Sequence, residues 1–237
     1  MFSVLILGLL LGLQHAVEAD HLAAVASLST RSHSLGDAAR HGMAWGLGHA
    51  LTLLVFGGSV LLLGGSIGPH LALLLEAAVG VMLVVLGADV LLRLWRKRVH
   101  YHVHSHGEET HFHAHSHVSG RPHVADLHQH RHKKPLPLRA LLVGMVHGMA
   151  GSAALMVFAL GSVQSVWQGL IYMAMFGFGS ILGMFALAIV ISLPLRWSAR
   201  SLTWAHNGLT TVLGIFTIAL GAMLLQQSTH GLMYGIA

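Results

Sequence analysis

The chain of 237 residues has no cysteine and little charge. The absence of cysteine excludes disulfide bonds, thiolate metal sites and CxxC redox chemistry. Charged residues make up 9% of the chain and hydrophobic residues 54%, whereas a soluble domain carries about 25% charged residues. This composition predicts an integral membrane protein. The first residues include no basic segment and no cleavage site follows the first apolar run, so we expect no removable signal peptide.

Six apolar runs are long enough for helices that span a bilayer, which need about 20 residues. They cover residues 2–28, 42–64, 71–95, 138–162, 166–194 and 206–226. The runs are continuous and rich in Leu, Ala and Gly, and they lack the alternation of barrel strands. We therefore predict an all-α, polytopic membrane protein with six transmembrane helices.

All 13 Lys and Arg residues fall on one side of this six-helix topology. The positive-inside bias makes that side cytoplasmic. We therefore predict a multi-pass protein of the cytoplasmic (inner) membrane, surrounded by lipid, with both termini extracytoplasmic. The net charge of +5 is explained by this topology, so we expect no nucleic-acid partner.

Three motifs in the first half of the chain have counterparts in the second half. The offsets are 132, 131 and 134 residues, for Gly12–His15 with Gly144–His147, Gly46–His49 with Gly177–Ser180, and Leu86–Ala88 with Leu220–Ala222. Three helices per half is an odd number, so the two halves, 1–95 and 135–237, are predicted to form a 3+3 inverted repeat, as in many transporters. Chance similarity between glycine-rich membrane helices is the alternative. Small residues also recur four apart, which lets membrane helices approach closely: Gly8 and Gly12, Gly42 and Gly46, Gly144 and Gly148, and Gly179 and Gly183.

Residues 96–134 differ from the rest of the chain because they hold 12 of its 21 histidines. The segment has almost no apolar periodicity, which predicts a disordered cytoplasmic loop between the two halves. Alternating His-x-His spacing suits chelation of divalent metals by imidazole, so we predict an accessory metal-binding loop; a solvated linker without a ligand is the alternative. The histidines are His100, His102, His104, His106, His111, His113, His115 and His117, followed by His123, His128, His130 and His132.

The first apolar run carries the stretch from His15 to His21, which includes two carboxylates. Ionisable groups at membrane depth are costly and usually face a bundle interior or a water-filled path. On an ideal helix, Glu18 lies at about −60° from His15 and His21 at about −120°, whereas Asp20 lies at about 140°. A straight helix therefore cannot point all four side chains inward. Either Asp20 makes a bond to another helix or to a ligand residue, or the helix is locally unwound.

Helical rise places three histidines from different helices at one depth. His21, His49 and His147 each lie about two turns from the cytoplasmic ends of their helices, with His15 and Glu18 a turn or two farther out. Each histidine alone is more often a hydrogen-bonded interior residue than a ligand. Together with the carboxylates they favour a cation path, whose predicted ligands are His15, Glu18, Asp20, His21, His49 and His147. Interfacial or structural roles are predicted for Glu76, Asp89, His206 and Asn207.

Nitrogen and oxygen donors without sulfur suit Ni²⁺, Co²⁺ or Zn²⁺ better than Cu(I). The cation is expected to be a transported substrate and not a permanently bound cofactor. The sequence shows no nucleotide motif. We therefore expect a permease driven without ATP, not an enzyme.

At these residues the chain resembles the nickel/cobalt transporter (NiCoT) family and its UreH-like, urease-accessory branch. The family signature, Arg-His-Ala-x-Asp-Ala-Asp-His-Ile, reads here as Gln14 to Leu22, with Gln14, Glu18 and Leu22 as departures. Leu47-Gly48-His49 matches the element in the family's next helix, and Gly144–Ala154 resembles the UreH-like branch. Six spans instead of eight is a further departure from the larger members. The resemblance implies inward secondary transport of Ni²⁺ or Co²⁺, with His15, Asp20 and His21 in the path and metalloenzyme-maturation proteins as cytoplasmic partners.

Other readings stay open at this point. A nickel/cobalt or zinc exporter would carry a similar histidine-rich loop. His15 and Asp20 also match the His-x4-Asp pair of glycerolipid acyltransferases, in which histidine is the general base. His15, His49 and His147 are possible haem ligands of a membrane redox protein. Acyl-transfer assays, a Soret band and metal flux distinguish these alternatives.

Overall fold

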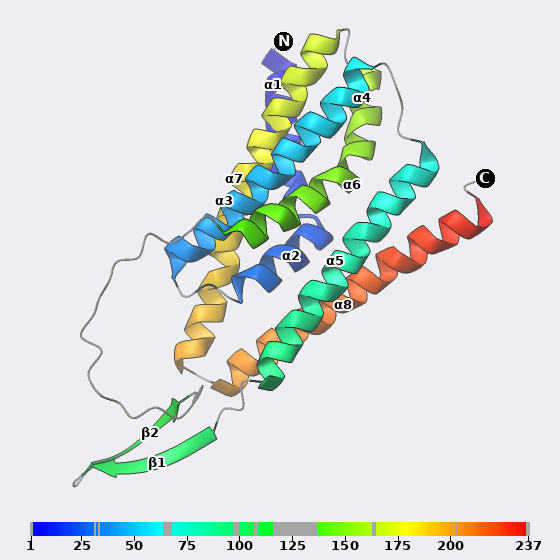
Figure 1. The fold of residues 1–237 in the computed structure, drawn as a ribbon. Helices are drawn as coiled ribbons and strands as arrows, with labels where there is room; N and C mark the ends of the chain where they lie inside the picture. Colours follow the sequence, from blue (N-terminus) through cyan, green and yellow to red (C-terminus); the bar gives the residue numbers. More distant parts are fainter. Residues whose placement is uncertain are drawn as a thin grey trace.

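The computed structural model describes residues 2–30, 32, 34–63, 68–96, 100–106, 109–115, 137–162, 165–201 and 203–235, and Figure 1 shows their arrangement. The helices run roughly along one axis, and both chain ends lie away from a β-hairpin at the opposite end (Figure 1). The elements are α1 (Phe2–His15), α2 (Ala19–Ser29), α3 (Leu35–Thr52), the π-helix η1 (Leu53–Gly57), α4 (Gly58–Leu62), α5 (Pro69–Arg96), β1 (His100–His106), β2 (Glu109–His115), α6 (Leu138–Ser162), α7 (Val166–Ser201) and α8 (Thr203–Tyr234).

Four of the described helices are long and apolar enough to cross a membrane. They cover Leu35–Leu62, Pro69–Arg96, Val166–Ala199 and Trp204–Tyr234. Two shorter apolar helices, Leu5–His15 and Leu138–Ala150, lie beside them. Large apolar side chains point outward along the long helices, for example Val85 at 60% exposure and Val212 at 64%. Such a surface is stable in lipid, so this is a membrane protein.

Exposed aromatic side chains mark both ends of the long helices. On α7, Trp167 and Trp197 are 70% and 71% exposed, and on α8, Trp204 and Tyr234 are 73% and 72% exposed. Each pair is separated by thirty residues, which is about 45 Å of helix. A bilayer with its interfacial regions is about 40–45 Å thick, and Trp and Tyr gather at the two interfaces. The spacing fits helices that reach from one interface to the other.

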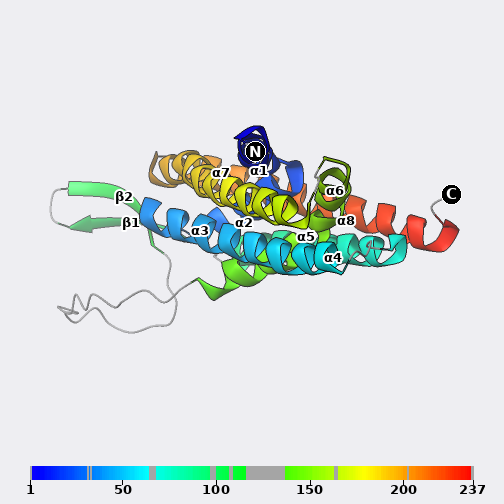
Figure 2. The ribbon, with the colours of Figure 1, turned by 90° about the horizontal axis from the view of Figure 1, so that it is seen from above.

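The first apolar run, predicted as one span over residues 2–28, is two helices. α1 ends at His15, the chain turns at Ala16 and Val17, and α2 begins at Ala19. Glu18 caps α2 in an extended conformation, with φ −63° and ψ 153°. α2 is almost wholly buried and contacts α3, α5, α7 and α8, so a short helix occupies the middle of the bundle (Figure 2). An apolar helix without a polar face is suited to such an interior position.

Glycines bring two pairs of helices into parallel backbone contact. A Cβ at Gly12 of α1 would overlap the carbonyl of Phe176 in α7, and a Cβ at Gly144 of α6 would overlap the carbonyl of Trp45 in α3. The contact between α1 and α7 continues at Gly183, which faces Ala16. The predicted role of the small residues in close helix approach is therefore confirmed at these positions.

Two further pairs are antiparallel. In the pair α3 and α7, Gly42 meets Ala188, whereas Gly177 meets Ala50 farther along α3. In the pair α5 and α8, Gly80 packs against Gly221 and Gly87 against Gly214. The α5–α8 pair lies along one side of the other helices (Figures 1 and 2).

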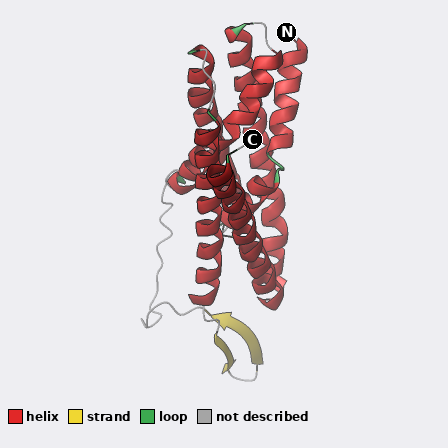
Figure 3. Cartoon of the chain, turned by 90° about the vertical axis from the view of Figure 1, so that its right-hand side faces the viewer, coloured by secondary structure: helices red, strands yellow, loops and turns green. Residues whose placement is uncertain are grey.

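Part of the histidine-rich segment forms an antiparallel hairpin that lies beyond the helical bundle (Figure 3). The expectation of an unstructured loop does not hold for 100–106 and 109–115. The alternation of histidine with residues such as Val103 and Phe112 has the period of a strand, and these two residues are cross-strand partners. The register also sets His100 opposite His115, His102 opposite His113 and His104 opposite His111. His117 and the later histidines of the segment lie outside the described residues.

Candidate metal centre

The break between α1 and α2 brings His15 and His21 together. Six residues of continuous helix would separate the two by about 9 Å along the axis. Because the chain turns sharply after His15, the two rings lie 4.3 Å apart between centroids. His15 was predicted one or two turns farther out than His21. That prediction is wrong, because the helix is interrupted between them.

His49 of α3 and His147 of α6 reach the same place from the other side. Gly148, next to His147, lies so close to α3 that a Cβ there would be 2.5 Å from the carbonyl oxygen of His49. The ring of His21 is 5.3 Å from that of His49 and 4.1 Å from that of His147. His21, His49 and His147 were predicted to share one depth, and the structure brings all three together.

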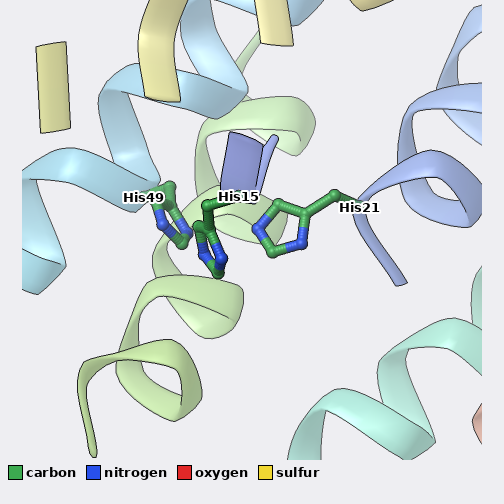
Figure 4. A group of neighbouring side chains, drawn as sticks. All are labelled: His15, His21 and His49. Carbon is green, nitrogen blue, oxygen red and sulfur yellow. The ribbon is translucent and has the colours of Figure 1, made fainter. Parts of the chain in front are cut away.

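Three of these side chains form a compact nitrogen donor set, the three-histidine group, which consists of His15, His21 and His49 (Figure 4). One ring nitrogen of each lies within 4.8 Å of the others. Nε2 of His15, Nε2 of His21 and both ring nitrogens of His49 are buried, and none has a hydrogen-bond partner among the described residues. Buried polar atoms are rarely left without a partner in native proteins, so a group of them calls for an explanation.

Asp20 lies between two histidines from different helices. Its Oδ1 is 2.9 Å from Nδ1 of His21, and its Oδ2 is 2.8 Å from Nε2 of His147. Both of the predicted solutions therefore occur together: the helix is unwound, and Asp20 makes an inter-helix bond. By engaging Nδ1 of His21, Asp20 leaves Nε2 facing the three-histidine group. A carboxylate in this position orients a metal-binding imidazole and raises its basicity.

Glu18 occupies a different position from the other predicted ligands. Its Oε1 is 3.0 Å from Nδ1 of His15, but its side chain is 56% exposed. It belongs to neither of the two groups of possible metal ligands among the described residues. The second of these groups is Asp20, His21 and His147, which shares His21 with the first. Glu18 therefore orients His15 from the rim of the centre.

The carboxylates predicted to be structural lie apart from the centre or in ion pairs. Asp89 is 3.2 Å from Nε of Arg93, four residues later on α5, and Arg93 donates to the hydroxyl of Thr30. His206 is within 3.2 Å of the carbonyl of Leu195.

Two aromatic residues of the centre were missed by sequence reasoning. Trp45 stacks near His147, with 5.7 Å between centroids, and Phe176 lies 5.2 Å from His15. Both are fully buried. The available signal was position: Trp45 lies four residues before His49, and Phe176 lies 131 residues after Trp45, the offset already seen between Gly46 and Gly177.

Comparison with known proteins assigns the chain to a membrane family. The family described as "Cytochrome C biogenesis protein transmembrane region" matches residues 3–223. "Urease accessory protein UreH" from Bacillus sp. (strain TB-90) is 34% identical over 221 residues, which cover 93% of this chain and 90% of that protein. The chain belongs to the UreH-like members of this transmembrane family. No solved structure gives a significant match. Because this UreH-like chain has no cysteine, thiol–disulfide exchange is excluded for it whatever other members of the family do.

Proposed function

We propose that this UreH-like protein is a secondary transporter that moves Ni²⁺ or Co²⁺ inward across the cytoplasmic membrane through the three-histidine group. One observation carries the proposal: buried nitrogen atoms of His15, His21 and His49 lie within 4.8 Å of one another and have no other partner among the described residues. Leaving such atoms unpaired in an apolar interior costs free energy. Coordination of a cation offsets that cost.

The chemistry of the donors favours late first-row divalent metals. Imidazole nitrogen suits Ni²⁺, Co²⁺ and Zn²⁺, and for a given nitrogen site Ni²⁺ is generally bound more tightly than Co²⁺. Asp20 supplies negative charge beside the group without occupying it, because both of its oxygens already contact histidine nitrogens. The three-histidine group is therefore the better candidate for the ion than the group of Asp20, His21 and His147.

The proposed topology has six spans in a 3+3 inverted repeat, with both termini extracytoplasmic and residues 96–134 in the cytoplasm. Paired contacts support the repeat. Gly12 against Phe176 corresponds to Gly144 against Trp45, at offsets of 132 and 131 residues. The α5–α8 contacts Gly80–Gly221 and Gly87–Gly214 exchange with each other at an offset of 134.

Reporter fusions test this topology. Fusions at residues 1 and 237 should both report an extracytoplasmic position, and a fusion at residue 120 a cytoplasmic one. A cytoplasmic C-terminus would contradict the six-span arrangement and the inverted repeat together.

The membrane potential is a sufficient driving force for inward movement. A divalent cation gains about 4.6 kcal/mol per 100 mV of inside-negative potential, twice the single-charge value. That energy corresponds to more than about a thousandfold accumulation. Transport then requires no ATP-binding domain.

The histidine-rich segment is proposed to collect the cation on the cytoplasmic side. Its eight-histidine set runs from His100 to His117, and the described part places pairs of histidines opposite each other in the hairpin register. The relative's role as a urease accessory protein supports delivery to metalloenzyme-maturation proteins. The segment is accessory, since it lies outside the helical bundle.

Metal flux into proteoliposomes tests the proposal. Purified protein should carry Ni²⁺ and Co²⁺ inward under an imposed inside-negative potential, and Zn²⁺ serves as the comparison ion. The His49→Ala variant should abolish flux, whereas His230→Ala, a change at an exposed histidine that stacks on Tyr234, should not. Flux only in the outward direction would identify an exporter. Equal flux with and without protein would refute the transporter proposal.

A further inference from the structure

Two aromatic rings enclose the histidine centre. Trp45 is 0% exposed, and its ring centroid is 5.4 Å from that of His21 and 5.7 Å from that of His147. Phe176 is 1% exposed, and its ring lies 5.2 Å from that of His15. A cation that reaches the centre along the helices must therefore pass one of the two rings.

The two rings occupy corresponding positions. Trp45 lies four residues before His49 on α3, and Phe176 lies four residues before Ser180 on α7. The carbonyl of Trp45 packs on Gly144, three residues before His147. The carbonyl of Phe176 packs on Gly12, three residues before His15, so each aromatic residue is paired with one centre histidine in the same way.

The rings lie on opposite sides of the centre. α3 and α7 are antiparallel, because Gly42 meets Ala188 and Gly177 meets Ala50. Each ring comes one helical turn before the centre on its own helix. Trp45 therefore lies toward the hairpin end of the molecule and Phe176 toward the end that holds the N-terminus (Figure 1).

The surroundings of the two rings differ. Behind Trp45 lies a narrow pocket lined by Val25, Leu28, Ser29, His41, Gly42 and Ala188. Behind Phe176 lies an apolar cluster of Leu53, Tyr172 and Met173, each at most 2% exposed. An ion on the hairpin side therefore has a partly polar approach that ends at Trp45. On the other side an apolar layer excludes water and ions, as hydrophobic constrictions do in channels.

We infer that Trp45 and Phe176 are the two gates of the path, one on each side of the histidine centre, and that they open one at a time. The inference rests on the proposed transport function for the identity of the cargo. The gates themselves follow from the placement of the rings. Alternating exposure of one central site is the mechanism that an inverted repeat supports.

Site-directed thiol labelling tests the gates. The chain has no cysteine, so the His49→Cys variant carries a single thiol at the centre. A membrane-impermeant methanethiosulfonate reagent, added to one face of oriented vesicles at a time, should label this thiol slowly from either face. With Phe176→Ala added, labelling should accelerate only from the N-terminal face. With Trp45→Ala added, it should accelerate only from the hairpin face.

The expected acceleration is at least about tenfold, because minor open states are commonly populated at roughly 0.1–10% and have room to rise. Matched controls are Phe178→Ala, at an outward-facing phenylalanine of α7 with 52% exposure, and Trp204→Ala, at 73% exposure; neither should change labelling. Acceleration from the same face in both variants, or in neither variant, would overturn the inference.

A second pair of variants protects the test against misfolding. Trp45→Leu and Phe176→Leu remove the ring and keep an apolar side chain, so they should show the same sidedness with a smaller acceleration. Labelling without sidedness in the leucine variants contradicts the gates. Thiol labelling needs no metal: sided labelling without Ni²⁺ flux would refute the cargo and keep the gates, and normal flux with unsided labelling would do the reverse.

Discussion

The molecule holds two collections of histidine that share little beyond the residue type. In the bundle, His15, His21, His49 and His147 come from α1, α2, α3 and α6, and they meet in a buried centre. In the hairpin, the histidines come from one continuous stretch, and local spacing alone sets them opposite one another. The first arrangement depends on the whole fold and leaves nitrogen atoms without partners. The comparison indicates that tertiary structure builds a selective site, whereas sequence repetition builds binding capacity.

The largest effect is expected from loss of a nitrogen ligand in the bundle. His21→Ala and His49→Ala should each lower Ni²⁺ affinity and uptake by more than about 100-fold, beyond the 10–100-fold typical of residues that only orient a ligand. The measurement is metal uptake by cells, with membrane insertion checked by fluorescence-detected gel filtration. Normal uptake in both variants would show that the cation path lies elsewhere.

The next effect comes from the backbone contact that positions His147 beside α3. A Cβ at Gly144 would overlap the carbonyl of Trp45, so Gly144→Ala should separate α3 from α6, lower the thermal stability and reduce uptake. The matched control is Gly208→Ala, since no atom lies within 4 Å of a Cβ built there. Equal melting temperatures for the two variants would contradict this role of Gly144.

Asp20→Asn keeps the shape of the side chain and removes its charge. Because Asp20 orients His21 and His147 and lies outside the three-histidine group, the variant should lose about 10–100-fold in metal affinity. Asp89→Asn, which changes a carboxylate paired with Arg93, is the control and should bind metal normally. A loss in Asp20→Asn as large as in His49→Ala would make Asp20 a direct ligand.

A smaller effect is expected at the rim of the centre. Glu18 is exposed and contacts only one of the centre histidines, His15. Exposed pairs of this kind contribute about 0–1 kcal/mol, so Glu18→Gln should change apparent affinity by less than about fivefold. Isothermal titration of Ni²⁺ into detergent-solubilised protein measures this change. Complete loss of binding would restore Glu18 to the ligand set that the sequence predicted.

The smallest effect on transport is expected from the other collection. Deletion of residues 100–132 should leave flux through the bundle intact in proteoliposomes and lower only the number of metal ions bound per chain. Loss of flux in a correctly inserted deletion variant would remove the distinction between the two collections, since the hairpin would then be part of the path.

Depth along a helix was predictable from the sequence, but lateral arrangement was not. Helical rise placed His21, His49 and His147 at one level because their helices are regular near those residues. The same reasoning misplaced His15, because the turn at Ala16 and Val17 shortens the distance to His21. Glu18 was grouped with the ligands because it shares a face with His15 on an ideal helix. The break turns it toward the surface instead.

The aromatic gates and the hairpin show two other limits. Trp45 and Phe176 resemble ordinary apolar residues of a membrane helix, and only their contacts with glycine-bearing helices bring them to the centre. The alternation of histidine was interpreted as a chelating pattern, but the same period of two also matches a β-strand. Patterns in one segment therefore indicated which residues are unusual. Contacts between segments decided what they form.

X-ray absorption spectroscopy of Ni²⁺ bound to the purified protein lacking residues 100–132 tests the central claim most directly. The account predicts one tightly bound ion per chain, with the multiple-scattering signature of imidazole ligands, and loss of that signature in the His49→Ala variant. An ion coordinated by oxygen alone, or an unchanged spectrum in His49→Ala, would contradict the assignment of the three-histidine group as the cation site.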